Sequence, residues 1–172
     1  KPVKSKTLEG HIMHCEHFVV NKSVLEKIIA GIGRITAVGT TSCRVLESLY
    51  WIGNRMSNGA TTHDIFRVSQ WQPYQDERKV SAEKALKNII EYLEKNNCDE
   101  IQCETEIIIT PGYEFTLVDT LITNFHQPQS TLILLVAAFV GEDWKKIYNH
   151  ALNNNYRFLS YGDSSMLRLK RQ

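Results

Sequence analysis

Apolar positions along the chain change their spacing several times, and each change marks the end of one predicted element. Apolar residues recur every three or four positions, the period of a helix, in residues 23–30, 45–52, 81–96 and 144–152. Residues 132–140 are apolar throughout and bounded by Ser130 and Gly141, which predicts a buried helix. Short runs rich in β-branched and aromatic residues predict strands at residues 16–20, 35–38, 63–68, 106–110, 115–122 and 156–160. We expect Ser23 and Glu26 to form a capping box that starts the first helix.

Strands and helices alternate in the first third of the chain, which is the order that right-handed crossovers between parallel strands produce. We therefore predict the α/β class, with a mostly parallel sheet or partial barrel and flanking helices. Residues 70–78 are polar and aromatic without a period, so no regular element is expected there.

Short polar loops with Gly or Pro follow four of the predicted strands: GTTS at 39–42, PGY at 111–113, TNFHQPQS at 123–130 and YGD at 161–163. Ligands of α/β proteins bind at the carboxyl ends of parallel strands. We predict that these loops gather around one pocket at one edge of the sheet.

The GTTS loop stands at the start of a predicted helix, where the first backbone N–H groups have no partner. With the hydroxyls of Thr40, Thr41 and Ser42 they offer a site for a phosphate or a carboxylate, since the helix dipole favours negative charge. The alternative is that Ser42 simply caps the helix. The Gly-Lys-Ser/Thr signature is missing, so this loop is not a P-loop.

Residues 9–17 concentrate three histidines, one cysteine and two carboxylates. His11, His14 and His17 are spaced by three and share a face only in a helix, whereas a strand is predicted here. No metal is therefore expected, and acid–base or hydrogen-bonding roles for His14 and Glu16 are favoured. Purely structural roles stay open, as does a metal-dependent hydrolase built on the histidine tract.

Phe125 lies between Asn124 and His126 in a loop, where an aromatic ring can stack on a nucleobase while its neighbours read the base edges. His126 is also a candidate general base, because an imidazole titrates near neutral pH. We expect Asp119, on the same strand, to orient it. The alternative is a histidine that only completes a turn. Asp163 either accepts hydrogen bonds from ribose hydroxyls or makes a turn.

Composition places the chain among globular proteins, with 42% hydrophobic residues, 23% charged residues and a net charge of +1. Contact with many phosphates would therefore need a local basic patch. The basic residues near the two ends are more simply solvent-exposed: Lys1, Lys4, Lys6, Arg168, Lys170 and Arg171. Four cysteines without a CxxC pair, and no signal peptide, indicate free thiols in the cytoplasm. The longest apolar run, residues 132–140, is far shorter than the roughly 20 residues that a membrane helix needs.

Four blocks, in this order, resemble the signature segments of the S-adenosylmethionine:tRNA ribosyltransferase-isomerase family: HIMHCE, AVGTTSCRVLES, PGYEFTLVDTLITNFHQPQSTLILLVAAFVG and YRFLSYGDSSML. The resemblance implies transfer and isomerisation of the ribosyl group of S-adenosylmethionine onto an aminomethyl-deazaguanine base of tRNA. The product would be epoxyqueuosine, with adenine and methionine released. It also implies a barrel-like α/β domain beside a smaller β-barrel domain, S-adenosylmethionine as co-substrate and the tRNA anticodon loop as partner.

Carried over block by block, the resemblance implies a catalytic set of His14, Glu16, Asp119 and His126. It implies a substrate-binding set of His11, Thr40, Thr41, Ser42, Arg44, Glu47, Tyr113, Asn124, Phe125, Ser130, Thr131, Tyr161, Gly162 and Asp163.

The chain departs from the family pattern in three places. Gln127 stands where the family usually has Leu, residues 68–104 look like an insertion, and the N-terminal portion with the small β-domain is absent; the sequence opens on Lys1 rather than Met. We therefore expect residues 1–172 to be the C-terminal α/β domain of a divergent two-domain enzyme, monomeric and inactive or nearly so by itself. The alternative is a non-catalytic RNA- or nucleoside-binding domain on the same scaffold.

Overall fold

The computed structural model describes residues 13–57, 65–78, 80–127 and 130–169. The first part of the chain forms β1 (Glu16–Asn21), α1 (Lys22–Gly31), β2 (Thr36–Val38) and α2 (Thr40–Met56). The predicted capping box is wrong, because α1 follows β1 directly and Asn21 is the last extended residue. Its side chain accepts a hydrogen bond from the Val24 backbone N–H at 3.0 Å.

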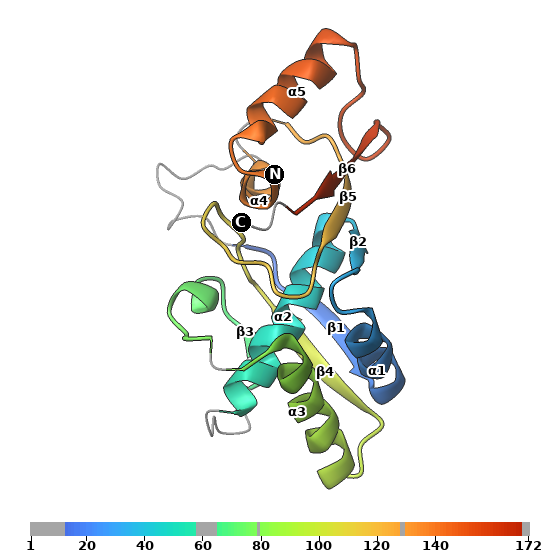
Figure 1. Ribbon diagram of the computed structural model, residues 1–172, viewed down its shortest axis with the longest axis vertical. Helices are drawn as coiled ribbons and strands as arrows, with labels where there is room; N and C mark the ends of the chain where they lie inside the picture. Colours follow the sequence, from blue (N-terminus) through green and yellow to red (C-terminus); the bar gives the residue numbers. More distant parts are fainter. Residues whose placement is uncertain (1–12, 58–64, 79, 128–129, 170–172) are drawn as a thin grey trace.

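The second part of the chain supplies the remaining elements. They are β3 (Arg67–Val68), the 3-10 helix η2 (Gln72–Tyr74), α3 (Ala82–Lys95), β4 (Glu100–Thr105), β5 (Thr120–Asn124), α4 (Thr131–Val140), α5 (Asp143–Asn153) and β6 (Ser164–Arg168). The α/β class is confirmed (Figure 1). Within the described residues, no helix has the length and apolar character needed to cross a membrane.

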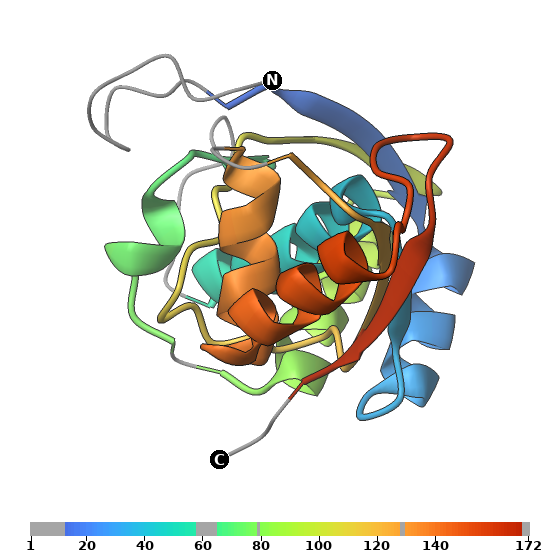
Figure 2. The same ribbon diagram turned by 90° about the horizontal axis from the view of Figure 1, so that it is seen from above.

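The strands form two three-stranded sheets with the orders β1-β4-β3 and β2-β5-β6. Each sheet contains one parallel and one antiparallel pairing. The sequence predicted a mostly parallel sheet, whereas half of the observed pairings are parallel. In the second sheet, β5 is followed by two helices, α4 and α5, before β6 begins. Two helices return the chain to the end of the sheet that it left, and β6 therefore runs antiparallel to β5. Figure 2 shows α4 and α5 lying on the same side of these strands.

Three predicted strands are placed differently in the structure. Residues 106–110 form no strand, although Ile107, Ile108 and Ile109 are buried. Their apolar character reflects burial in the core, which a continuous apolar run does not distinguish from a strand. Only the end of the predicted 115–122 strand is regular, as the start of β5. Residues 156–160 form no strand: the segment is irregular and ends in a bend and turn, in which Leu159 has a φ of 70°.

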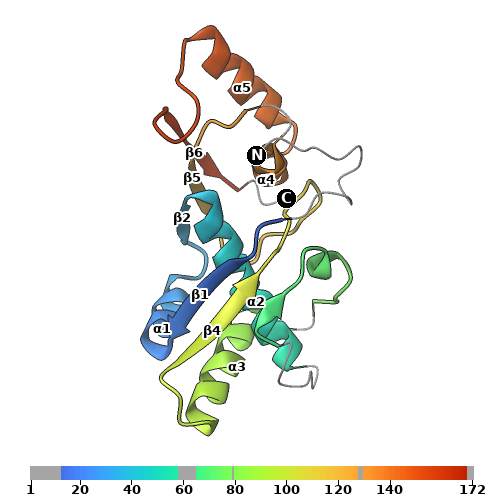
Figure 3. The same cartoon turned by 180° about the vertical axis from the view of Figure 1, so that it is seen from behind.

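Helix α2 is the centre of the core, with the β1–β4 pair on one side and α3 beside it (Figures 1 and 3). Leu49, Tyr50, Trp51 and Ile52 on α2 are at most 2% exposed. Gly53 permits the close approach of α3, because a Cβ atom there would lie 2.0 Å from the Ala85 carbonyl oxygen. The amino-terminal end of α2 projects toward the second sheet.

Candidate functional site

Three of the four predicted loops meet at one edge of the β2-β5-β6 sheet. Strands β2 and β5 are parallel with Val38 opposite Ile122, so their carboxyl ends lie side by side. The Gly39 backbone N–H donates to the Ile122 carbonyl at 2.8 Å. Strand β6 is antiparallel and starts with Ser164 opposite Asn124, which brings the preceding YGD loop to the same edge. We call residues 39–42, 124–127 and 161–163 the rim.

Backbone hydrogen bonds join the last two of these loops. The Phe125 N–H donates to the Asp163 carbonyl at 3.3 Å, and the Leu159 N–H donates to the Phe125 carbonyl at 2.8 Å. The Asn124 side chain also donates to the Gly162 carbonyl at 3.2 Å. The segment around Tyr161 is thereby held against the end of β5.

The amino-terminal end of α2 opens onto the rim without a side-chain cap. Gly39 is the N-cap residue, with φ 89° and ψ 151°, and as a glycine it has no side chain that could accept from the first turn. Ser42 is therefore not the cap. Thr41 and Ser42 are exposed and Thr40 is half-buried. The first N–H groups of α2 form an accessible site for a carboxylate or a phosphate.

Arg44, one turn into α2, ties the HIMHCE segment to this helix. Its side chain is 6% exposed, and it donates to the Ile107 carbonyl at 2.9 Å and to the His14 carbonyl at 3.1 Å. Its Nη1 lies 3.3 Å from Glu16 Oε1. The His14 side chain is left exposed, and Glu16 is half-buried. Arg44 thus positions both candidate acid–base residues; His11 lies outside the described residues.

Glu47 and Tyr113 form a buried network that holds the PGY loop against the middle of α2. Glu47 is fully buried and accepts from the Leu117 and Val118 backbone N–H groups, each at 2.9 Å, and from Thr116. The Tyr113 hydroxyl donates to Glu47 at 2.9 Å. Burial raises the pKa of Glu47, while the four donors act in the opposite direction. The polar atoms of both side chains are engaged within this network, away from the rim. Tyr113 also lines a cavity beside the PGY loop, so the role of these two side chains in substrate binding stays a prediction.

His126 lies on the rim and is half-buried. Its Nε2 is 3.0 Å from Thr123 Oγ1, and its backbone N–H donates to the Tyr148 hydroxyl at 3.2 Å. Burial lowers the pKa of His126 from its usual value, which favours the neutral imidazole that a general base requires.

The prediction that Asp119 orients His126 is wrong. Asp119 precedes β5 and His126 follows it, so the length of the strand separates them, about 16 Å at 3.3 Å per residue. Asp119 instead accepts from the Ile35 backbone N–H at 2.9 Å and thereby fixes the entry to β2.

The prediction that Phe125 stacks on a nucleobase is also wrong, because its ring belongs to the core. Phe125 is 4% exposed and packs edge-to-face on Tyr148 and Tyr156, with ring centroids 5.5 and 5.6 Å apart. Tyr161, in the neighbouring loop, is 98% exposed. The aromatic ring that the rim presents to a ligand is therefore that of Tyr161.

The remaining predicted residues shape the rim loops. Asp163 accepts from the Arg157 backbone N–H at 2.7 Å, which holds the pKa of its carboxyl group below the usual value and supports the turn role. A Cβ atom at Gly162 would lie 2.3 Å from the Arg157 carbonyl oxygen, so glycine is required by close packing. Ser130 donates to the Gln127 carbonyl at 2.9 Å, and Thr131 begins α4.

A second candidate site, which the sequence did not predict, surrounds Arg78. This residue lies in the 70–78 segment, for which no regular element was expected. The Arg78 guanidinium lies over the rings of Tyr50, Trp51 and Tyr113, between 4.9 and 5.6 Å from their centroids. Arg78 lines a cavity of about 490 Å³ beside the PGY loop. No spacing signal reveals such a site, since its members come from three distant segments.

Known proteins share this α/β fold. The family model described as "Queuosine biosynthesis protein" matches residues 1–167, and the chain belongs to this family. The family likeness seen in the sequence is thereby confirmed.

Individual relatives cover nearly the whole chain but are much longer. S-adenosylmethionine:tRNA ribosyltransferase-isomerase of Polynucleobacter asymbioticus is 37% identical over 170 residues, covering 96% of this chain and 36% of the relative. The protein of the same name from Vesicomyosocius okutanii is 35% identical over 170 residues, covering 96% of this chain and 37% of its own length. The crystal structure of S-adenosylmethionine tRNA ribosyltransferase from Thermotoga maritima matches with a TM-score of 0.55 and 31% identity, over 87% of this chain and 39% of that one. The chain thus spans a little over a third of the length of these relatives.

Proposed function

We propose that this chain supplies part of the site of a tRNA ribosyltransferase-isomerase. The reaction transfers and isomerises the ribosyl group of S-adenosylmethionine onto the aminomethyl-deazaguanine base of tRNA, giving epoxyqueuosine and releasing adenine and methionine. The names of the relatives support the reaction class. The observation that carries the proposal is the meeting of the α2 amino-terminal end, His126 and the Tyr161 loop at one edge of a sheet.

The start of α2 has the chemistry to hold the anionic part of a substrate. Its first N–H groups, which have no partner within the helix, and the exposed hydroxyls of Thr41 and Ser42 suit the carboxylate of the methionine moiety or a tRNA phosphate. Because the helix dipole and the N–H groups are fixed in the fold, they need no rearrangement when the anion arrives.

The reaction needs a base that removes a ribose proton, and His126 fits this role best. Its burial favours the neutral imidazole, and its Nε2 contact with Thr123 fixes the ring orientation. His14 and Glu16 are the alternatives, held beside α2 by Arg44.

The exposed ring of Tyr161 offers a stacking surface for a base of the anticodon loop. With a net charge of only +1, the affinity for tRNA would rest on local contacts of this kind more than on a general positive field. We further propose that the protein acts in the cytoplasm, where its tRNA substrate is found.

Adenine release tests this function. The protein encoded by the full reading frame that contains this sequence is mixed with S-adenosylmethionine and tRNA carrying the precursor base, and adenine is measured by chromatography. We expect release that depends on both substrates, and little or none from the 172 residues alone. Binding of tRNA without adenine release would overturn the enzyme assignment in favour of an RNA-binding domain.

A further inference from the structure

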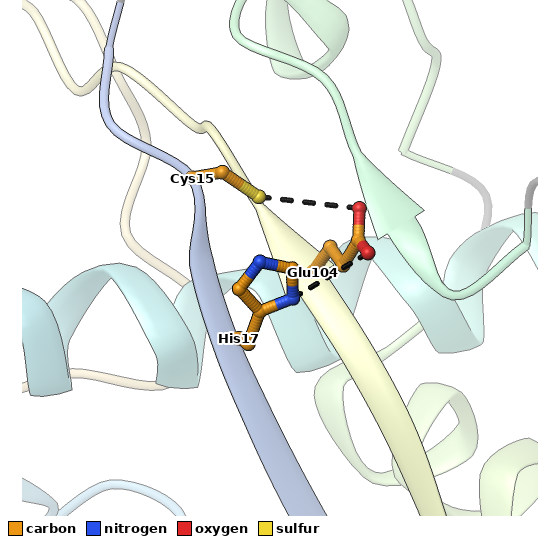
Figure 4. A group of neighbouring side chains, drawn as sticks. All are labelled: Cys15, His17 and Glu104. Carbon is orange, nitrogen blue, oxygen red and sulfur yellow. Dashed lines mark hydrogen bonds and ion pairs between the residues drawn. The ribbon is translucent and has the colours of Figure 1, made fainter.

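A second group of reactive side chains lies on the first sheet, on the face opposite to Glu16. Alternate residues of a strand point to opposite faces, so Cys15 and His17 project away from α2 while Glu16 reaches Arg44 on that helix. His17 stands directly opposite Glu104 in the antiparallel pairing of β1 with β4. Figure 4 shows Cys15, His17 and Glu104 pointing toward one another across the two strands.

The distances within this group are close to those of a tetrahedral zinc site. The Cys15 Sγ lies 3.9 Å from Glu104 Oε2, the His17 Nδ1 lies 3.4 Å from Glu104 Oε1, and the three ligand atoms all lie within 4.8 Å of one another. Zinc bonds of about 2.0 to 2.3 Å place neighbouring ligand atoms about 3.3 to 3.8 Å apart at the tetrahedral angle. A small movement of the Cys15 side chain therefore completes the geometry.

The group is accessible and its charge suits a divalent cation. The side chains of His17 and Glu104 are 73% and 42% exposed. The neighbouring cation, Arg67, is held by Glu106 through Nη2 contacts of 3.1 and 3.2 Å, whereas its Nε stands 3.9 Å from Glu104. Glu106 thus takes up most of the charge of Arg67, and the Glu104 carboxylate faces Cys15 and His17.

We propose that Cys15, His17 and Glu104 bind one zinc ion, which joins β1 to β4 on the outer face of the first sheet. Thiolate, imidazole and carboxylate are the ligand types that zinc takes in proteins, and water would complete the four-coordinate shell. On binding, the Cys15 Sγ gives its proton to the solvent and forms a bond to the metal. The proposal does not depend on the proposed enzymatic function.

Zinc at this position would fix the start of β1, because Cys15 immediately precedes this strand and His17 is its second residue. Glu16 lies between these ligands and points to the other side of the strand, toward Arg44. The ion would therefore stabilise the segment that carries His14 and Glu16, from the face of the sheet opposite to Arg44. Since the folded state alone presents the three ligands together, zinc should raise the melting temperature.

Cobalt titration tests the proposal directly. The protein, purified without a polyhistidine tag and treated with a chelator, is titrated with Co²⁺ and followed by absorption. We expect one equivalent to produce thiolate-to-cobalt charge-transfer absorption together with the visible bands of tetrahedral cobalt, and both to disappear when Zn²⁺ is added.

Variants of the ligands and a matched control identify the site. Cys15→Ser should abolish the charge-transfer absorption, and His17→Gln and Glu104→Gln should each weaken zinc binding by at least about tenfold. Cys98→Ser removes an exposed thiol that precedes β4 and is not part of the group, and it should leave binding unchanged. Unchanged cobalt spectra in Cys15→Ser, or spectra lost in Cys98→Ser, would overturn the assignment.

A measurement on the unaltered protein guards against variants that fail to fold. Stoichiometric Zn²⁺ should protect Cys15, but not Cys98, from alkylation, as read by peptide mass spectrometry. Equal alkylation of Cys15 with and without Zn²⁺ would overturn the proposal.

Discussion

The Gly39 backbone N–H donates to the Ile122 carbonyl at 2.8 Å, and this bond joins the start of α2 to the end of β5. Because β2 is only three residues long, this contact extends the pairing by one residue and delivers the first turn of α2 to the rim. Backbone hydrogen bonding, rather than a side-chain contact, therefore places the start of α2 beside the end of β5, the strand that His126 follows.

Replacing Gly39 by Ala should weaken this junction. Gly39 has φ 89° and ψ 151°, a region that L-residues rarely adopt, and nothing lies within 4 Å of the added Cβ atom. The cost is therefore conformational, and the free energy of unfolding should fall by about 1–3 kcal/mol in urea titrations. Gly31→Ala is the control, because a Cβ there meets only an ordinary contact of 3.5 Å with Ile35 and its φ is not positive. Equal stability of the two variants would contradict the assignment of strain to Gly39.

The two aromatic residues of the rim should respond oppositely to truncation. Phe125→Ala removes a buried ring and should lower the free energy of unfolding by about 3–5 kcal/mol. Tyr161→Ala alters an exposed side chain, so stability should change by less than about 0.5 kcal/mol.

Tyr161→Ala should instead weaken tRNA binding by about 1–3 kcal/mol, the usual contribution of one stacked base. Fluorescence anisotropy with a labelled anticodon stem-loop measures this change. The control is Leu152→Ala, which truncates an exposed apolar side chain on α5, outside the rim. This variant should bind tRNA as tightly as the unaltered protein does. If both variants bind equally, Tyr161 is not a stacking residue.

The Glu47 carboxylate should stabilise the folded protein, because it holds the PGY loop against α2. Glu47→Gln places an amide among donors, so that one or more buried N–H groups lose their acceptor, at about 1–3 kcal/mol each. Chemical unfolding should show a loss of at least about 2 kcal/mol. Glu94→Gln breaks only an exposed ion pair with Lys22 and should cost less than about 0.5 kcal/mol. A Glu47→Gln protein as stable as Glu94→Gln would show that the buried Glu47 network does not stabilise the PGY loop.

His126 should make stability depend on pH in a defined direction. Burial lowers its pKa in the folded state below the value of about 6.5 in the unfolded chain. Between these two values the unfolded chain binds more protons, so stability should fall as the pH drops below about 6.5 and level off below the folded pKa. His126→Gln should flatten this part of the profile of melting temperature against pH, whereas His150→Gln, on the exposed face of α5, should not. An unchanged profile in His126→Gln would show that this imidazole is not the group responsible.

The sequence predicted four of the five helices to within a residue or two, because each has a periodic apolar face or an apolar run with clear ends. The exception is α2, predicted over 45–52, which begins at Thr40 and continues through Gly53 to Met56. α3, predicted at 81–96 and observed at Ala82–Lys95, is the clearest case. The strands were harder to place, since burial alone makes residues 107–109 apolar without a pairing partner. Local patterns do not reveal which segments pair.

The same limit explains which of the candidate site residues the sequence placed correctly in the fold. The loops at the ends of β2 and β5 follow from strand order, so their meeting at the rim was predictable. The burial of Phe125 and the distance of Asp119 from His126 depend on tertiary packing, and the sequence could not supply them. The group of Cys15, His17 and Glu104 was missed because the search used helical spacing. In a strand, residues two apart share a face, and the third member is known only from the register of β1 on β4.

Amide chemical-shift mapping tests the central claim, that the rim is one binding site. The isotope-labelled protein is titrated with S-adenosylmethionine, and backbone N–H signals are followed by NMR. We predict that the signals of Thr40, Thr41 and Ser42 shift together with those of His126 and Tyr161, with a single affinity. Shifts confined to the cavity around Arg78, with the signals of the rim unmoved, would contradict the account.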